Sequence, residues 1–148
     1  KLVQANKELE SLALQDNLTK LPNRLFLVEY TDALFLESNE RKSRTALIYI
    51  DLDRFKSVND AFGHHVGDEL LVKLAQRLYP LLGQGQKLIR IGGDEFILIA
   101  ERVNKAQAEK IASLVLQKIQ DSFQISGKEI NISASIGIVF FPDHGKSL

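Results

Sequence analysis

The sequence predicts an α+β fold, in which a central, mostly antiparallel sheet is flanked by helices. Segments whose apolar residues recur at helical spacing alternate with short apolar runs that suit strands. Two of these runs, 87–91 and 96–100, are separated only by Gly92-Gly93-Asp94-Glu95, which is typical of a tight turn. This spacing indicates a β-hairpin, and the two strands of a hairpin pair antiparallel.

The first half of the chain is predicted to hold two helices and a strand. Residues 1–15 are polar with leucines at heptad spacing, which indicates either a signalling helix ending a coiled coil or a plain surface helix or linker. Asp16-Asn17-Leu18-Thr19 predicts a break and a helix cap, and Pro22 suits the first turn of a helix that ends near Ser38-Asn39. The apolar run 45–52 is typical of a central strand buried on both faces.

The second half is predicted to add a helix, the hairpin, another helix and a strand. A short polar turn leads to a helix over 67–82, and Asn104 caps a long helix after the hairpin. Alternating residues over 130–139 predict the last strand, which Pro142 ends. Because there are no internal repeats, residues 16–148 are expected to form one domain.

Composition excludes several classes of function. The chain has 148 residues, and its 19 basic and 19 acidic side chains cancel, which argues against a nucleic-acid partner or an anionic membrane surface. Cysteine is absent, which excludes disulfides, thiolate nucleophiles and Cys-ligated zinc. No segment approaches the roughly 18 apolar residues of a membrane span, so no direct membrane contact is expected. The chain begins with Lys1 and lacks methionine, so we expect it to be a piece of a longer protein.

Two acidic motifs could hold a metal ion. Asp51 and Asp53 would point to one face at the end of the buried strand, where Mg²⁺ could join carboxylates to substrate phosphates. The hairpin acids Asp94 and Glu95 could supply a further carboxylate. The alternatives are solvated residues at a strand end and a plain glycine turn. An EF-hand is excluded because Phe62 stands where its bidentate Glu should be.

A third group of polar residues follows the buried strand. Asn59, Asp60 and Asp68 could hydrogen-bond the edge of a purine, or could simply serve turns and helix caps. His64-His65 lacks the second ligand cluster that a zinc site needs. Gly145-Lys146-Ser147 lacks the first glycine of a P-loop.

Together and in this order, these motifs resemble the GGDEF domains, which are diguanylate cyclases. The resemblance covers residues 16 to about 145. The motifs that carry it are Asp16-Asn17-Leu18-Thr19, Leu21-Pro22-Asn23-Arg24, Asp51-Leu52-Asp53-Arg54-Phe55-Lys56, Asn59-Asp60, Phe62-Gly63-His64, Gly67-Asp68, Arg90, Gly92-Gly93-Asp94-Glu95-Phe96 and Ser135-Ile136-Gly137-Ile138.

The resemblance implies a fold, a reaction and partners. The fold would be palm-like, as in nucleotide cyclases and polymerases. The activity would be that of a nucleotidyltransferase, which joins two GTP into cyclic di-GMP and releases two pyrophosphates. Each domain would present one GTP, so a homodimer would be needed, controlled by an upstream sensor. A GTP substrate implies a cytoplasmic module, whether or not the parent protein is anchored in a membrane. A silent GTP-binding regulatory domain is the main alternative, and a cyclic di-GMP receptor is a further one.

The resemblance also implies the metal site. Asp51 and Asp94 would ligate Mg²⁺, or Mn²⁺ in its place, helped by the backbone carbonyl of Leu52. Glu95 would assist the metal or activate the attacking hydroxyl. Asp53 would either support the metal site or be structural.

The nucleotide contacts are implied in the same way. Asn59 and Asp68 would bind guanine, and Lys56 would steady a phosphate. Gly92 and Gly93 would let the nucleotide lie against the backbone.

Two departures from the family are visible. Many members carry an inhibitory Arg-x-x-Asp site for the product before the hairpin, but here Gly83 and Gln86 replace the Arg and the Asp. Inhibition through this site is therefore not expected. Family members continue into a C-terminal helix whose Lys and Arg hold phosphates, and this chain stops at Leu148, so we expect that helix to be missing.

Overall fold

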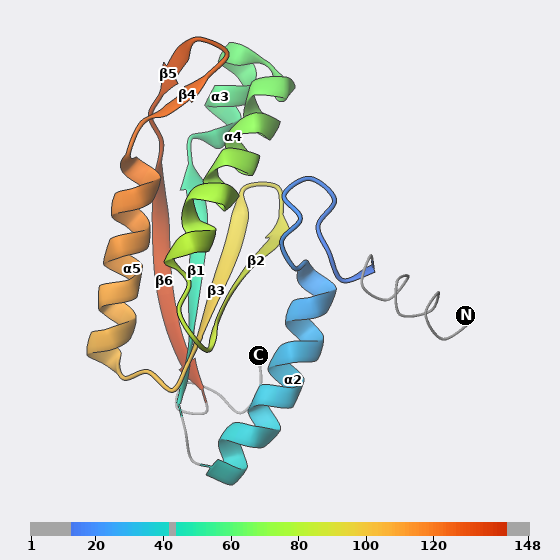
Figure 1. Cartoon of the computed structure of the whole chain (residues 1–148), viewed down its shortest axis with the longest axis vertical. Coiled ribbons are helices and arrows are strands. Elements are labelled where there is room, and N and C mark those ends of the chain that lie inside the picture. Colours follow the sequence, from blue (N-terminus) through green and yellow to red (C-terminus); the bar gives the residue numbers. More distant parts are fainter. Residues whose placement is uncertain (1–12, 42–43, 142–148) are drawn as a thin grey trace.

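A four-stranded antiparallel sheet with strand order β2-β3-β1-β6 forms the centre of the fold (Figure 1). The computed structural model describes residues 13–41 and 44–141. The four strands are β1 (Thr45–Asp53), β2 (Gln86–Gly92), β3 (Glu95–Glu101) and β6 (Ser133–Phe141). A separate hairpin is formed by β4 (Phe123–Ile125) and β5 (Lys128–Ile130). The predicted α+β class with an antiparallel sheet is confirmed.

Helices cover the two faces of the sheet unequally. The α-helices are α2 (Arg24–Arg41), α3 (Phe55–Phe62), α4 (His64–Leu78) and α5 (Lys105–Gln120), and a short 3₁₀-helix, η1 (Tyr79–Leu81), follows α4. Helices α4 and α5 bury one face in the main core. Helix α2 packs near one end of the other face in a smaller apolar cluster (Figure 1). None of the described helices is long and apolar enough to cross a bilayer.

Strand β1 separates the core from the site. Its even-numbered residues, such as Ile48 and Ile50, are fully buried against α4 and α5. Side chains alternate along a strand, so Tyr49, Asp51 and Asp53 point to the opposite face. Leu47 lies under α2 on that face, whereas Tyr49 is 37% exposed. The carboxylates therefore lie on a part of the sheet that solvent reaches.

Several predicted boundaries need correction. Helix α2 begins at Arg24 and Asn23 caps it by accepting a hydrogen bond from the Phe26 N–H, so Pro22 lies before the helix and not in its first turn. Pro22 instead forms an isolated bridge with Gln15. Helix α4 begins at His64 and not at residue 67, and its last predicted turn is 3₁₀.

The predicted helix after the hairpin and the predicted last strand are both present, whereas two observed elements were not predicted. Asn104 caps helix α5, as predicted, through a capping box in which the side chains of Asn104 and Gln107 bond each other's backbone N–H. The last strand is confirmed, although it spans 133–141. The polar turn expected after β1 is helix α3, and the hairpin β4–β5 was not predicted. The signalling helix predicted over 1–15 lies mostly outside the described residues, as do Pro142 and Gly145-Lys146-Ser147.

Arg77 of α4 joins three elements. Its guanidinium donates hydrogen bonds to the carbonyls of Lys118, Asp121 and Ser122 at 2.7–3.0 Å, which satisfies the end of α5. The same group lies 3.6 Å above the ring of Phe123 in β4. A planar, always charged fork is required for this set of contacts.

We predict that Arg77→Ala lowers the free energy of unfolding by about 2 kcal/mol, because charged hydrogen bonds and the ring contact are lost together. Arg77→Lys keeps the charge but not the planar fork, so it should lower the free energy of unfolding by less than Arg77→Ala does. Urea unfolding measures the change. The control is Lys110→Ala, at an exposed position on α5, whose free energy of unfolding should lie within about 0.5 kcal/mol of that of the original chain. Equal stability of the Arg77 and Lys110 variants would contradict the prediction.

Candidate active site

The register of β1 against β3 brings the predicted acidic residues together. Asp51 lies opposite Glu95 of β3 and opposite Ser135 of β6. The backbone N–H of Leu52 donates to the carbonyl of Asp94 at 3.0 Å, which ties the end of β1 to the hairpin turn. Three of the predicted residues, Asp51, Asp94 and Glu95, therefore meet at one end of the sheet.

The turn itself requires glycine for its backbone. Gly92 has a φ of +149° and Gly93 a φ of +47°, conformations that other residues adopt only with strain. A Cβ built on either glycine would meet nothing within 4 Å. The space in front of the turn is therefore open, and another molecule could lie directly against the backbone.

The carboxylates at this end of the sheet repel one another. Burial contributes most to raising the pKa of Asp51, and the negative charges of Asp94, Glu95 and Asp53 raise it further. A divalent cation between these groups would relieve the repulsion.

Tyr49 is a site residue that the sequence did not reveal. Its hydroxyl donates a hydrogen bond to Glu95, and this bond is the main reason why the pKa of Tyr49 is raised to about 12. The hydroxyl therefore stays protonated and can keep holding Glu95. Only the register places these two residues together, because Glu95 lies diagonally across from Tyr49 on the same face.

The donor set suits magnesium held partly by a substrate. Among the described residues, no group of three or more His, Asp or Glu side chains is placed to hold a metal ion alone. Mg²⁺ does not need such a cage, since one or two carboxylates with water and phosphate oxygens commonly hold it. Asp51, Asp94 and the carbonyl of Leu52 fit that pattern.

Asp53 is tied to β6 and not to the turn. Its Oδ1 accepts a hydrogen bond from the Ser135 hydroxyl at 2.8 Å, and its backbone pairs with Ser133. The two roles considered for Asp53, supporting the metal site or maintaining structure, both agree with this contact.

The predicted guanine-binding residues lie on the facing helices α3 and α4. A Cβ on Gly67 would lie only 1.8 Å from Oδ1 of Asn59, so the Asn59 side chain packs directly on the backbone of α4. Asp68, which is exposed, follows Gly67. Lys56 is exposed in the first turn of α3, a helix that no side chain caps at its N-terminus. Thus the fold packs Asn59 against Gly67, the residue that precedes Asp68, and Lys56 lies toward the end of β1.

Arg90 joins the turn to the segment before α2. Its Nε and Nη2 donate to the carbonyl of Gly93 at 3.1 and 2.9 Å, while Nη1 donates to both carboxylate oxygens of Asp16 at 3.1 Å. Burial alone would raise the pKa of Asp16, but hydrogen bonds from Thr19 and the charge of Arg90 together lower it. The motif contained Arg90, yet its role was not predicted, because its partner lies 74 positions away.

The structure also shows where Gly83, Gln86 and the two adjacent histidines lie. The Gly83 N–H donates to Oε1 of Gln86 at 2.9 Å, so these residues close a small turn. They present neither the guanidinium nor the carboxylate of an Arg-x-x-Asp site. His64 and His65 are exposed at the start of α4.

Fold and site together define an α+β domain with carboxylates at a glycine-rich hairpin turn. Residues 13–148 match the family described as diguanylate cyclase, GGDEF domain. Because the match covers nearly the whole chain, the chain belongs to the GGDEF family.

Two relatives that the chain resembles are much longer than the chain itself. It is 43% identical over 146 residues to the bifunctional diguanylate cyclase/cyclic di-GMP phosphodiesterase MucR of Pseudomonas aeruginosa, covering 99% of the chain and 21% of MucR. It is 37% identical over 141 residues to the cyclic di-GMP phosphodiesterase PdeR of Escherichia coli, covering 95% of the chain and 21% of PdeR. The chain thus spans about a fifth of the length of these two relatives.

A solved structure agrees with the fold. The GGDEF domain of TpbB from Pseudomonas aeruginosa superposes with a TM-score of 0.85 at 35% identity, covering 90% of this chain and 78% of that chain.

We predict that Gly67→Ala lowers the free energy of unfolding by about 1–3 kcal/mol, because the new methyl group collides with Asn59. Urea unfolding measures the loss, and the NMR signal of the Asn59 side-chain amide reports its displacement. Gly137→Ala in β6 is the matched control, since its Cβ would meet nothing within 4 Å. A loss below about 0.5 kcal/mol with an unshifted Asn59 signal would refute the packing described here.

Proposed function

We propose that the chain is the catalytic domain of a diguanylate cyclase, which condenses two GTP molecules into cyclic di-GMP and two pyrophosphates. The observation that carries the proposal is the β1–β3 register, which gathers Asp51, Asp94 and Glu95 at an open glycine turn. Membership of the GGDEF family and a relative named as a bifunctional diguanylate cyclase support it.

The substrate would lie between the helices and the hairpin. The carboxylate of Asp68 can accept hydrogen bonds from N1–H and the exocyclic amine of guanine, and Asn59 can both donate and accept at the same edge. Lys56 would steady a phosphate near the end of β1. Gly92 and Gly93 would let the nucleotide approach the turn without a side chain in the way.

Asp51 and Asp94 would hold Mg²⁺, or Mn²⁺ in its place, with the carbonyl of Leu52. The bound ion would supply positive charge to the phosphoryl group during an in-line displacement. Glu95 would receive the proton of the attacking hydroxyl, directly or through water. The hydrogen bond from Tyr49 would keep the Glu95 carboxylate oriented for that role.

The reaction forms two bonds and breaks two. Each 3′-hydroxyl oxygen attacks the α-phosphorus of the other GTP, the bond to the β-phosphate bridging oxygen breaks, and pyrophosphate leaves. One copy of the site would present one GTP, and a second copy would present the other. Two domains must therefore meet face to face, so the working unit would be a homodimer whose encounter rate an attached domain can control.

The parent protein would be a larger signalling protein. Relatives extend well beyond the region that this chain matches, and MucR is named for a phosphodiesterase activity as well. We propose that the parent protein also carries an upstream sensor that controls dimerisation. With GTP as its substrate, the domain would work in the cytoplasm.

A silent regulatory domain is the second candidate. PdeR, at 37% identity, is named only as a cyclic di-GMP phosphodiesterase. In that case, this chain would bind GTP and control an attached domain without making product.

We predict that the chain, alone or within its full-length protein, forms cyclic di-GMP from GTP and Mg²⁺. Asp94→Asn and Glu95→Gln should each reduce the rate by about 100-fold or more, because one weakens metal binding and the other removes the proton acceptor. Chromatography with mass detection measures the product. Asp32→Asn, on the exposed side of α2, is the control and should keep the rate. GTP binding without product in confirmed dimers would favour the regulatory domain.

A further inference from the structure

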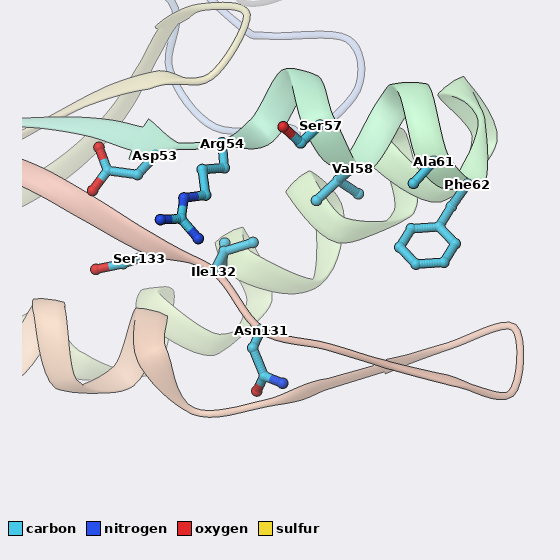
Figure 2. Close-up of a pocket in the computed structure, with 9 residues that line it drawn as sticks. All are labelled: Asp53, Arg54, Ser57, Val58, Ala61, Phe62, Asn131, Ile132 and Ser133. Atoms are coloured by element: carbon cyan, nitrogen blue, oxygen red, sulfur yellow. The ribbon is translucent and has the colours of Figure 1, made fainter.

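A pocket of about 530 Å³ lies beside α3, and Asn59 is not among the residues that line it (Figure 2). The end of β1, one side of α3 and the segment that leads into β6 form its walls. Its lining is mixed: Val58 and Ile132 are apolar, whereas Ser57 and Ser133 bring hydroxyls. None of the substrate contacts proposed above accounts for this pocket.

Among the described residues that line the pocket, Arg54 is the only cationic one. Figure 2 shows its guanidinium reaching from the start of α3 into the space beside Asp53 and Ile132. Within the described part of the chain, this guanidinium has no hydrogen bond or ion pair. A guanidinium offers five N–H donors in a planar fork, which matches the oxygens of a phosphoryl group.

The backbone of Arg54 is also unusual. With φ 62° and ψ 21°, it is left-handed, a conformation that costs a residue other than glycine free energy and that recurs at ligand sites. This conformation lets the chain turn sharply from β1 into α3. The side chain at this turn is thereby held next to the strand end that carries the carboxylates.

The pocket begins where the proposed metal site ends. Asp51 and Asp53 point to the same face of β1 and are about 7 Å apart along the strand. Asp53 lines the pocket, and its Oδ1 is already bonded to the Ser135 hydroxyl. An anion here faces one carboxylate and one guanidinium, with the proposed cation at Asp51 adding positive charge. A phosphate chain whose α-phosphate lies at Asp51 would thus extend toward Arg54.

We propose that Arg54 binds the terminal phosphates of the nucleotide and then the pyrophosphate that leaves, a role that rests on the proposed function. Its fork would donate two parallel hydrogen bonds to phosphoryl oxygens. As the bond between the α-phosphorus and its bridging oxygen breaks, that oxygen and the pyrophosphate gain negative charge, which the guanidinium stabilises. Arg54 is then a specificity residue for the triphosphate, separate from the guanine contacts.

The test compares nucleotides with and without the terminal phosphates. Isothermal titration with Mg²⁺ measures the affinity of the chain for GTP and for GMP. Arg54→Gln should lower the affinity for GTP about tenfold and leave the affinity for GMP unchanged. The affinity of Arg54→Lys for GTP should lie between those of the original chain and Arg54→Gln. Arg102→Gln is the matched control, because Arg102 is also exposed and left-handed but follows β3 at the opposite end of the sheet. The proposal would be overturned if Arg54→Gln lowered the affinities for GTP and GMP equally, or if it did not lower the affinity for GTP.

Pyrophosphate separates this proposal from the proposed function. Magnesium pyrophosphate should bind the original chain, and Arg54→Gln should lose most of that binding. If the chain binds neither GTP nor GMP, the proposed function fails, whereas binding of pyrophosphate through Arg54 still supports the pocket. The proposal for Arg54 is overturned if pyrophosphate does not bind, or if it binds the original chain and the Arg54→Gln variant with equal affinity. This holds whatever the affinity for GTP.

Discussion

The pairing of β1 with β3 is the constraint on which the site depends. It sets Asp51 across from Glu95, and the bond from Leu52 to the carbonyl of Asp94 fastens the turn to the end of β1. A slip of one residue would move every β1 side chain to the other face. Ile48 and Ile50 prevent that slip, because they are fully buried and would have to enter solvent. The apolar core on one face therefore determines where the carboxylates lie on the other.

Other contacts hold the charged end of the sheet together. The negative charges that raise the pKa of Asp51 are unfavourable for the folded chain, and the left-handed Gly93 and Arg54 add conformational restrictions. The Arg90 guanidinium opposes these costs by binding the turn carbonyl and Asp16 at once. The segment that precedes α2 is thereby joined directly to the turn that presents Asp94.

Local patterns were enough to predict the sheet, the hairpin and α5. The two-residue period, the glycine turn and the Asn104 cap are encoded in adjacent residues. Helix α3 was not predicted because it has only eight residues, although Phe55, Val58 and Phe62 have helical spacing. The hairpin β4–β5 was not predicted because each of its strands has only three residues, although Ser126-Gly127 indicates its turn.

The predicted site residues came from motifs and the resemblance, and not from local pattern alone. Their packing could not be predicted in the same way. The contact of Asn59 with Gly67 depends on how α3 folds back against α4. The pairs Tyr49–Glu95 and Arg90–Asp16 join residues far apart in the chain, so they emerge only once the register is set. Arg54 was part of a motif, but its direction depends on a left-handed backbone that the sequence pattern does not reveal.

The most direct test of the central claim is to locate a bound metal ion in solution. Mn²⁺ titrated into the isotopically labelled chain, in the presence of GTP, should broaden the NMR signals of Asp51, Leu52 and Asp94 first. Asp51→Asn should remove that selective broadening. Broadening centred on His64 and His65, or unchanged in the Asp51 variant, would mean that the β1–β3 register does not build the metal site.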